Sequence, residues 1–272
     1  MSAEETRPDP QAVKACCADL YSRDGIRLIL GETLHPGNLA LTARLAKLLG
    51  LTNRARVLDV GAGPGASAHY LARTLGCRVA GLDLSHANLA RAVRRVSEWG
   101  VAGAVALSVG DAAALPYREG VFDAVVAECA FSTFPEKERV ARELFRVLAP
   151  GGRLGLADVT IQPGALPGEW SGMLMQAACL ADARPVEGYQ GILAEAGFKR
   201  FSSEAHREAL SSLLGMVRRH LLLGHLAGWA RQPPFPGLDL GMAESIVEGA
   251  ARLVRNGALG YVLLIAQRPH ER

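Results

Sequence analysis

Three glycines and an acidic residue are placed where a small molecule could bind. Gly61, Gly63 and Gly65 lie in the segment VLDVGAGPGAS, after an apolar run and before a stretch typical of a helix. Glycines at such a junction permit a tight turn and let a ligand approach the backbone closely. Asp59 lies two residues before the first glycine, where a carboxylate would repel a pyrophosphate and attract a positive centre. The sequence therefore predicts a site for a cationic ligand without phosphate.

Two further acids indicate that this ligand is a nucleoside. Asp83 ends the next apolar run, about 20 residues further on, where a carboxylate commonly accepts hydrogen bonds from ribose hydroxyls. Asp111, followed by Ala112 in GDAAALP, ends a third run and could reach an adenine amine. The nicotinamide pattern G-x-G-x-x-G fits less well, because the third glycine comes one residue early and Pro64 stiffens the loop. S-adenosylmethionine carries a sulfonium, an ammonium and no phosphate, so these residues favour it as the cofactor.

Alternating strands and helices must position these residues. Between about residues 55 and 160, five short apolar segments are separated by helical patterns. Such alternation predicts right-handed crossovers and a mostly parallel sheet, in which successive strands end at the same edge. Before this region, a helix is expected to begin at Pro10 with Asp9 as its cap.

Five segments resemble the successive motifs of class I S-adenosylmethionine-dependent methyltransferases. They are VLDVGAGPG, GLDLS, GDAAALP, FDAVVAE and RVLAPGGRLGLAD, in this order. The resemblance implies an α/β fold with a Rossmann-like seven-stranded methyltransferase sheet, mostly parallel with an antiparallel last strand, and helices on both faces. It also implies an N-terminal helical lid over residues 1–50, a cofactor-binding core over 51–162, and a substrate lobe with the final strands over 163–272.

The same resemblance assigns residues to the cofactor. Asp59 and the loop would lie near its methionine part, Asp83 near its ribose, and Asp111 near its adenine. Glu128, at the end of the fourth strand, would face the reaction centre, either as a base or as a carboxylate opposite the sulfonium. The full set of expected cofactor residues is Asp59, Gly61, Ala62, Gly63, Gly65, Asp83, Leu84, Asp111, Ala112 and Glu128.

Two cysteine-containing segments resemble arsenite methyltransferases. Cys129 begins CAFSTFPEKERV, and Cys179 lies in LMQAACLADARP. The resemblance implies that both thiolates hold trivalent arsenic, which suits the preference of soft sulfur ligands for soft centres. A cysteine usual after the glycine loop and a C-terminal pair are missing, and the tail reads AQRPHER. Cys16 and Cys17 could supply the missing thiols, although packing on the apolar face of the first helix would explain them equally well.

Three other polar residues have alternative interpretations. His35, in LHPGN, could contact cofactor or substrate, although a turn residue is the simpler explanation. Tyr21 could hydrogen-bond the cofactor or pack in the core. Asp158 could line the pocket or cap a turn.

Composition excludes several classes of protein. The chain has 272 residues, 49% of them apolar, and a net charge of +3 from well-mixed acids and bases, so no nucleic-acid partner is expected. No apolar run approaches the ~18 residues of a membrane span. The polar, acidic N-terminus is unlike a secretory signal, and five cysteines in a chain of this length do not indicate a disulfide framework. A cytoplasmic protein with an undetermined oligomeric state is expected.

Three functional hypotheses follow from these features. The first is methyl transfer from S-adenosylmethionine to arsenite or methylarsenite held by Cys129 and Cys179, with a thiol as reductant. The second is methylation of oxygen, nitrogen, carbon or sulfur in a small organic metabolite, with the cysteines only lining the pocket. The third is a metalloid-binding module without catalysis, which the complete glycine loop and its acids disfavour.

Overall fold

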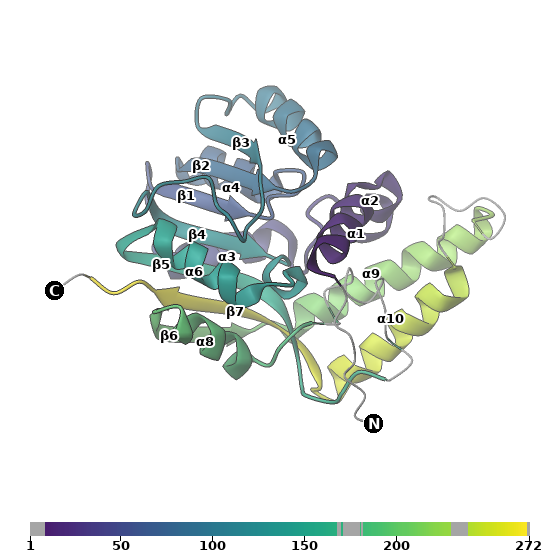
Figure 1. The fold of residues 1–272 in the computed structure, drawn as a ribbon. Coiled ribbons are helices and arrows are strands. Elements are labelled where there is room, and N and C mark those ends of the chain that lie inside the picture. The colour runs from purple at the N-terminus through teal and green to yellow at the C-terminus, as the bar shows by residue number, and fades with distance from the viewer. Residues whose placement is uncertain (1–8, 168–169, 171–179, 181, 230–238, 271–272) are drawn as a thin grey trace.

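The computed structural model describes residues 9–167, 170, 180, 182–229 and 239–270, which form a seven-stranded sheet covered by helices (Figure 1). The strand order is β3-β2-β1-β4-β5-β7-β6. The strands are β1 (Arg56–Val60), β2 (Arg78–Asp83), β3 (Val105–Val109), β4 (Phe122–Glu128), β5 (Leu148–Ile161), β6 (Lys199–Ala205) and β7 (Leu259–Gln267). β7 pairs antiparallel with both of its neighbours, whereas β1 to β5 pair in parallel. The predicted seven-stranded, mostly parallel sheet with an antiparallel last strand is confirmed.

Helices cover both faces of this sheet. They are α1 (Pro10–Ser22), α2 (Asp24–Leu30), α3 (Asn38–Leu49), α4 (Ala66–Leu75), α5 (His86–Glu98), α6 (Lys137–Val147), α8 (Val186–Glu195), α9 (Arg207–Leu226) and α10 (Leu240–Arg255). In β4, Ala124 and Val126 pack into the core shared with α3 and α4, whereas Val125 and Ala127 pack into the core shared with α6 and α8. Because side chains alternate along a strand, a strand buried on both faces is apolar throughout, as the sequence shows.

The N-terminal helices contain one predicted and one unpredicted element. α1 begins at Pro10, and the side chain of Asp9 accepts a hydrogen bond from the main-chain N–H of Gln11 at 3.3 Å, so the predicted cap is confirmed. The sequence pattern does not predict α2, because seven residues are too few to show a helical repeat. α2 packs against α9, and Asp24 at its start pairs with Arg91 of α5 at 2.8 Å.

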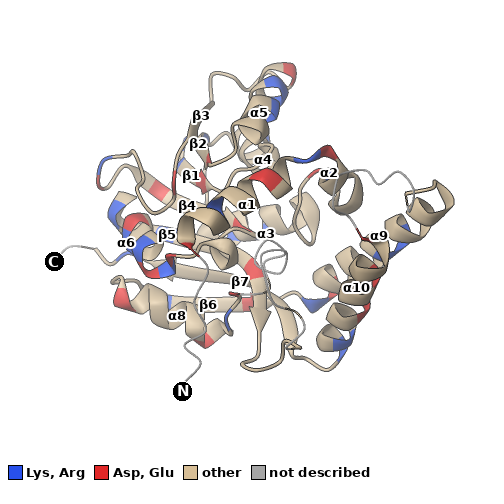
Figure 2. Cartoon of the chain, turned by 45° about the vertical axis from the view of Figure 1, so that its right-hand side comes forward, with Lys and Arg blue, Asp and Glu red and all other residues tan. Residues whose placement is uncertain are grey.

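The last two helices form an arm beside the sheet. α9 and α10 pack against each other and extend away from the strands (Figure 1). Acidic and basic residues both occur along α5, α6 and α10 (Figure 2). Among the described residues, no helix combines the length and the apolar character that crossing a membrane requires.

Candidate active site

A cavity of about 1080 Å³, counted with its open mouth, lies where β1, β2 and β4 end. α1 and the loop before α3 close it from the other side. Most of the predicted site residues line this cavity, namely Cys17, Asp59, Gly61, Ala62, Gly63, Asp83, Leu84, Asp111, Ala112, Glu128 and Cys129. Gly65 caps α4 beside the cavity, Cys16 is half-buried on α1 outside its lining, and Cys179 lies outside the described residues.

The glycine loop is held in place by the carboxylate of Asp83. Gly61 and Gly63 adopt φ values of 76° and 52°, a region that side chains other than glycine rarely occupy. The main-chain N–H of Gly63 donates to one oxygen of Asp83, and that of Ser85 donates to the other, both at 2.8 Å. A Cβ on Gly61 would lie 2.7 Å from the Cβ of Ala130, so glycine is needed where β1 and the loop after β4 approach each other.

Asp59 is a buried carboxyl group without a compensating cation among the described residues. It is 2% exposed, and its Oδ2 has no hydrogen-bond partner in the described part of the chain. Burial, followed by repulsion from Glu128 and Asp83, raises its pKa well above the ordinary value. A positively charged ligand beside Asp59 would relieve this unfavourable electrostatic arrangement.

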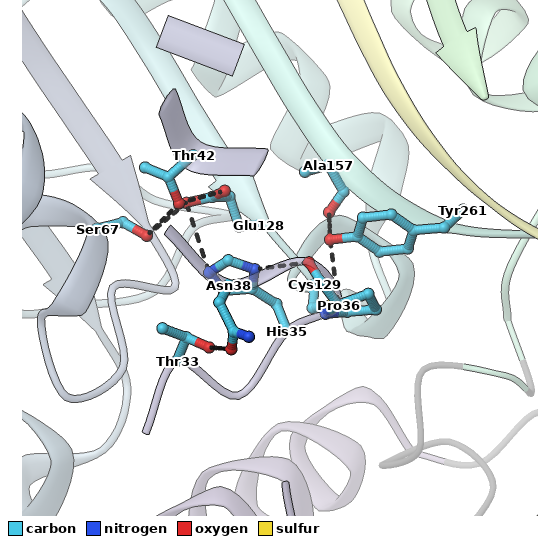
Figure 3. A network of polar contacts seen from close by, with 10 residues as sticks. All are labelled: Thr33, His35, Pro36, Asn38, Thr42, Ser67, Glu128, Cys129, Ala157 and Tyr261. Carbon is cyan, nitrogen blue, oxygen red and sulfur yellow. Dashed lines mark hydrogen bonds and ion pairs between the residues drawn. The ribbon is translucent and has the colours of Figure 1, made fainter. Parts of the chain in front are cut away.

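Glu128 is the centre of a buried polar network (Figure 3). The hydroxyl of Thr42 donates to its two oxygens at 3.0 and 3.1 Å, and the hydroxyl of Ser67 donates to Oε2. The Nε2 atom of His35 lies 4.0 Å from Oε2. These contacts fix one carboxylate at the end of β4 with polar groups from three separate segments.

Cys129 follows Glu128 in an uncommon conformation. Its φ is 49°, and its N–H donates to the carbonyl of Ala157 at 2.8 Å. Its thiol donates to the hydroxyl of Tyr261 at 3.5 Å, and that hydroxyl donates to the same carbonyl at 3.1 Å (Figure 3). Burial, assisted by nearby Cys129 and Glu128, raises the pKa of Tyr261 well above its ordinary value. Tyr261 is therefore a neutral hydrogen-bonding group beneath Cys129.

Comparisons with known proteins identify the family. The profile of a family described as "Methyltransferase domain" matches residues 58–156. A sarcosine/dimethylglycine N-methyltransferase from Halorhodospira halochloris is 36% identical over 191 residues, which are 67% of this chain and 67% of that protein. The chain belongs to the class I S-adenosylmethionine-dependent methyltransferases.

Two other relatives of this methyltransferase match over most of its length. A 27-O-demethylrifamycin SV methyltransferase from Amycolatopsis mediterranei is 29% identical over 240 residues, which are 87% of this chain and 86% of that protein. The crystal structure of the [4+2]-cyclase SpnF superposes with a TM-score of 0.75 at 26% identity, covering 97% of this chain and 98% of that one. In a curated relative from Streptomyces halstedii, by contrast, the match spans only 57% of that protein's length.

The cavity of this methyltransferase fits the family cofactor. The unpartnered Oδ2 of Asp59 suits an ammonium or a sulfonium. The carboxylate of Asp83 accepts hydrogen bonds from the main chain of Gly63 and Ser85 and from the side chain of Asn88. A carboxylate has about four lone-pair sites, so one is left for a ribose hydroxyl. A Cβ on Gly63 would meet no atom within 4 Å, so the loop faces open space in which a ligand can lie.

Asp111, the residue predicted to reach adenine, also contacts α1. Its Oδ2 accepts from the ammonium of Lys14 at 2.8 Å, and its Oδ1 accepts from the N–H of Ala113 at 2.9 Å. Burial would raise the pKa of Asp111, but these hydrogen bonds and the charge of Lys14 outweigh burial, and the pKa is lowered. Lys14 also pairs with Glu136, so one buried ammonium joins α1 to two segments of the methyltransferase core.

Asp158 caps a turn, which was the structural alternative to lining the pocket. Its oxygens accept from the N–H groups of Ser132 and Val159 at 2.9 and 2.8 Å, and it is fully buried.

Sequence patterns missed Thr42 and Ser67. Ser67 follows the glycine loop closely, which is a usable indication, whereas Thr42 lies in an apolar helix with nothing to mark it.

Proposed function

We propose that this protein transfers a methyl group from S-adenosylmethionine to a small organic molecule. The observation that carries the proposal is the set of three carboxylates at consecutive strand ends, where Asp59 is buried without a described cation beside it. Among the relatives, one is named for sarcosine and dimethylglycine and one for a rifamycin, and both names describe organic acceptors.

Each part of the cavity has a proposed role in holding the cofactor. Asp59 and the glycine loop would hold the methionine part, Asp83 the ribose, and Asp111 with the N–H of Ala112 the adenine. When bound, the cofactor supplies a methyl carbon made electrophilic by its positive sulfur. The chain aligns the acceptor and excludes water, which lowers the barrier because charge disappears during the transfer.

Binding and turnover test this function separately. Titration calorimetry with S-adenosylmethionine and S-adenosylhomocysteine should show one site per chain, and NAD should give no heat. Formation of S-adenosylhomocysteine should then be followed with alcohols, phenols, amines, thiols and arsenite as acceptors. Binding without turnover on any acceptor would support a module without catalysis, and absence of binding would refute the proposal.

The arsenic hypothesis is a second candidate, favoured by one observation. The thiols of Cys17 and Cys129 both line the cavity, although no group of three or more His, Cys, Asp or Glu residues suited to a metal occurs among the described residues. If arsenite is the acceptor, Cys129→Ser and Cys179→Ser should each abolish its methylation. If the acceptor is organic, both variants should retain the rate on that acceptor, with Cys77→Ser as the matched control remote from the cavity.

A further inference from the structure

A buried ammonium group lies behind the wall of the cavity. Lys137 begins α6, and its side chain is 2% exposed. Its Nζ atom donates to the carbonyl oxygens of Ser132 and Phe134, both at 2.8 Å, and to Oδ2 of Asp182 at 2.6 Å. An ammonium has three donors, so each of them has a partner here. This charge is buried to hold other parts of the chain, because it does not line the cavity.

The loop after β4 needs this partner, because it has few hydrogen bonds of its own. The loop contains a 3₁₀ turn of three residues, Phe131–Thr133, and the last carbonyls of so short a turn have no partner within it. Lys137 donates to the carbonyls of Ser132 and Phe134. On the other side, the N–H of Ser132 donates to the carboxyl group of Asp158 on β5 at 2.9 Å. The loop is thus held between α6 and β5.

The same loop forms one wall of the cavity. Its residues 133–135 line the cavity, and the loop begins beside Glu128 at the end of β4. At its other end, Glu136 pairs with Lys14, which also pairs with Asp111. The wall therefore runs from the acid expected at the reaction centre to the acid expected at the adenine. A shift of this loop would change the width of the whole proposed cofactor site.

Asp182 extends the connection to the segment before α8. Its Oδ1 accepts from the guanidinium of Arg184 at 2.5 Å, and the carbonyl of Arg184 accepts from the N–H of Ile161 at the end of β5. Burial lowers the pKa of Lys137, whereas the charge of Asp182 and its hydrogen bond oppose this shift. Asp182 therefore supports the ammonium that holds the loop, and one ion pair joins residues 182–184 to the cavity wall.

We propose that Lys137 is a positioning residue, which fixes the wall formed by residues 133–135 for cofactor binding and couples it to residues 182–184; the inference rests on the methyl transfer proposed above. Lys137 acts through the backbone of the loop. Without it, the carbonyls of Ser132 and Phe134 lose their donor, and a loop that must turn toward other donors no longer keeps one shape. Cofactor binding then has to reorder the loop, which lowers the affinity.

Hydrogen exchange tests the hold on the loop in the protein without ligand. Lys137→Met keeps the length of the side chain but removes the charge and the donors, and Lys47→Met is the matched control on the exposed surface of α3. Exchange followed by mass spectrometry should be about tenfold faster in a peptide covering residues 129–136 of Lys137→Met. Exchange in α5 should stay within twofold of the wild type. Equal acceleration in both peptides would indicate a merely structural role, and either this result or unchanged exchange would overturn the proposal.

Calorimetry with S-adenosylhomocysteine tests the effect on binding, at a temperature where circular dichroism shows each variant folded. Lys137→Met should bind about fivefold to tenfold more weakly than the wild type, and Lys47→Met should bind equally well. Asp182→Asn should weaken binding about threefold and also accelerate exchange in residues 129–136. This variant carries the test if Lys137→Met does not fold. Because Asp182 acts through Lys137, adding Asp182→Asn to Lys137→Met should have no further effect.

Two binding results would refute this role of Lys137. One is an affinity of Lys137→Met within twofold of the wild type. The other is an Asp182→Asn substitution that keeps its full effect in the Lys137→Met background, because the two side chains would then act independently. A wild-type protein that binds no S-adenosylhomocysteine would instead refute the proposed function, and the exchange of residues 129–136 would still decide whether Lys137 holds the loop.

Discussion

Replacing Asp59 by Asn should stabilise the cofactor-free protein while weakening cofactor binding. Asp59 is 2% exposed, one of its oxygens has no partner in the described structure, and burial with neighbouring acids raises its pKa well above the ordinary value. Asn has nearly the same shape, and its oxygen can still accept the hydrogen bond from the N–H of Ala68. The substitution therefore removes the charge and little else.

The size and pH dependence of this effect follow from the burial of the carboxyl group. Burial and repulsion from Glu128 and Asp83 disfavour the charged form of Asp59, and each pKa unit of such a shift corresponds to about 1.4 kcal/mol. Removing this charge in Asp59→Asn should therefore raise the free energy of unfolding by about 1–2 kcal/mol at pH 8. The pKa of Asp59 is higher in the folded protein than in the unfolded chain, so the folded state binds more protons. The free energy of unfolding of the wild type then falls as the pH rises from the pKa of Asp59 in the unfolded chain to its higher pKa in the folded protein. The advantage of Asp59→Asn should be small at acid pH and grow across that window.

Urea unfolding of the cofactor-free proteins at pH 5 and pH 8, followed by circular dichroism, measures both effects. Asp123→Asn is the matched control, because Asp123 is exposed and its hydrogen bonds to Arg56 lower its pKa. That control should lose stability, by less than about 1 kcal/mol. Calorimetry should show that Asp59→Asn weakens S-adenosylmethionine binding about tenfold or more, the equivalent of ~1.4 kcal/mol. A variant less stable than the wild type at pH 8, with unchanged affinity, would refute this reasoning.

Three further substitutions test, in turn, α1 as the proposed lid, the glycine loop, and the role of Tyr261 beneath Cys129. Lys14→Gln, which removes the ion pairs of this buried ammonium with Asp111 and Glu136, should cost about 1–3 kcal/mol and speed the dissociation of S-adenosylhomocysteine several-fold in stopped-flow fluorescence; an unchanged rate would argue against α1 as a lid. Gly61→Ala, with φ at 76° and a new Cβ 2.7 Å from that of Ala130, should cost about 1–3 kcal/mol and abolish cofactor binding, whereas a wild-type Tm would show that the loop adapts. Tyr261→Phe should cost about 1 kcal/mol in thermal unfolding with cofactor affinity within twofold, and a large loss of affinity would contradict its purely supporting role.

The parts of the fold dictated by local chemistry could be predicted from the sequence. The glycine loop, the strand-end acids Asp59 and Asp83, and the start of α1 at Pro10 each depend on a few consecutive residues. The parallel sheet follows from the alternation of strands and helices, because crossover rules leave few arrangements. The prediction that β7 is antiparallel came from family resemblance, since its apolar sequence does not indicate a direction.

The polar network around Glu128 could not be predicted in the same way. Thr42 and Ser67 lie 86 and 61 positions from Glu128 in the sequence, and His35 lies in an irregular loop. Lys14 is 97 positions from Asp111. Such contacts depend on how distant segments pack, and a single polar residue in an apolar helix has no local feature that reveals its partner. The arsenic ligands remain a prediction, because Cys179 lies outside the described residues.

The most direct test of the central claim is a calorimetric titration of the purified protein with S-adenosylhomocysteine, repeated with Asp83→Asn. We predict one site per chain in the wild type and markedly weaker binding in the variant, because Asp83 both holds the glycine loop and would bind the ribose. A wild-type protein that produces no binding heat with this nucleoside at any temperature tested, and shows no shift in Tm in its presence, would contradict the account.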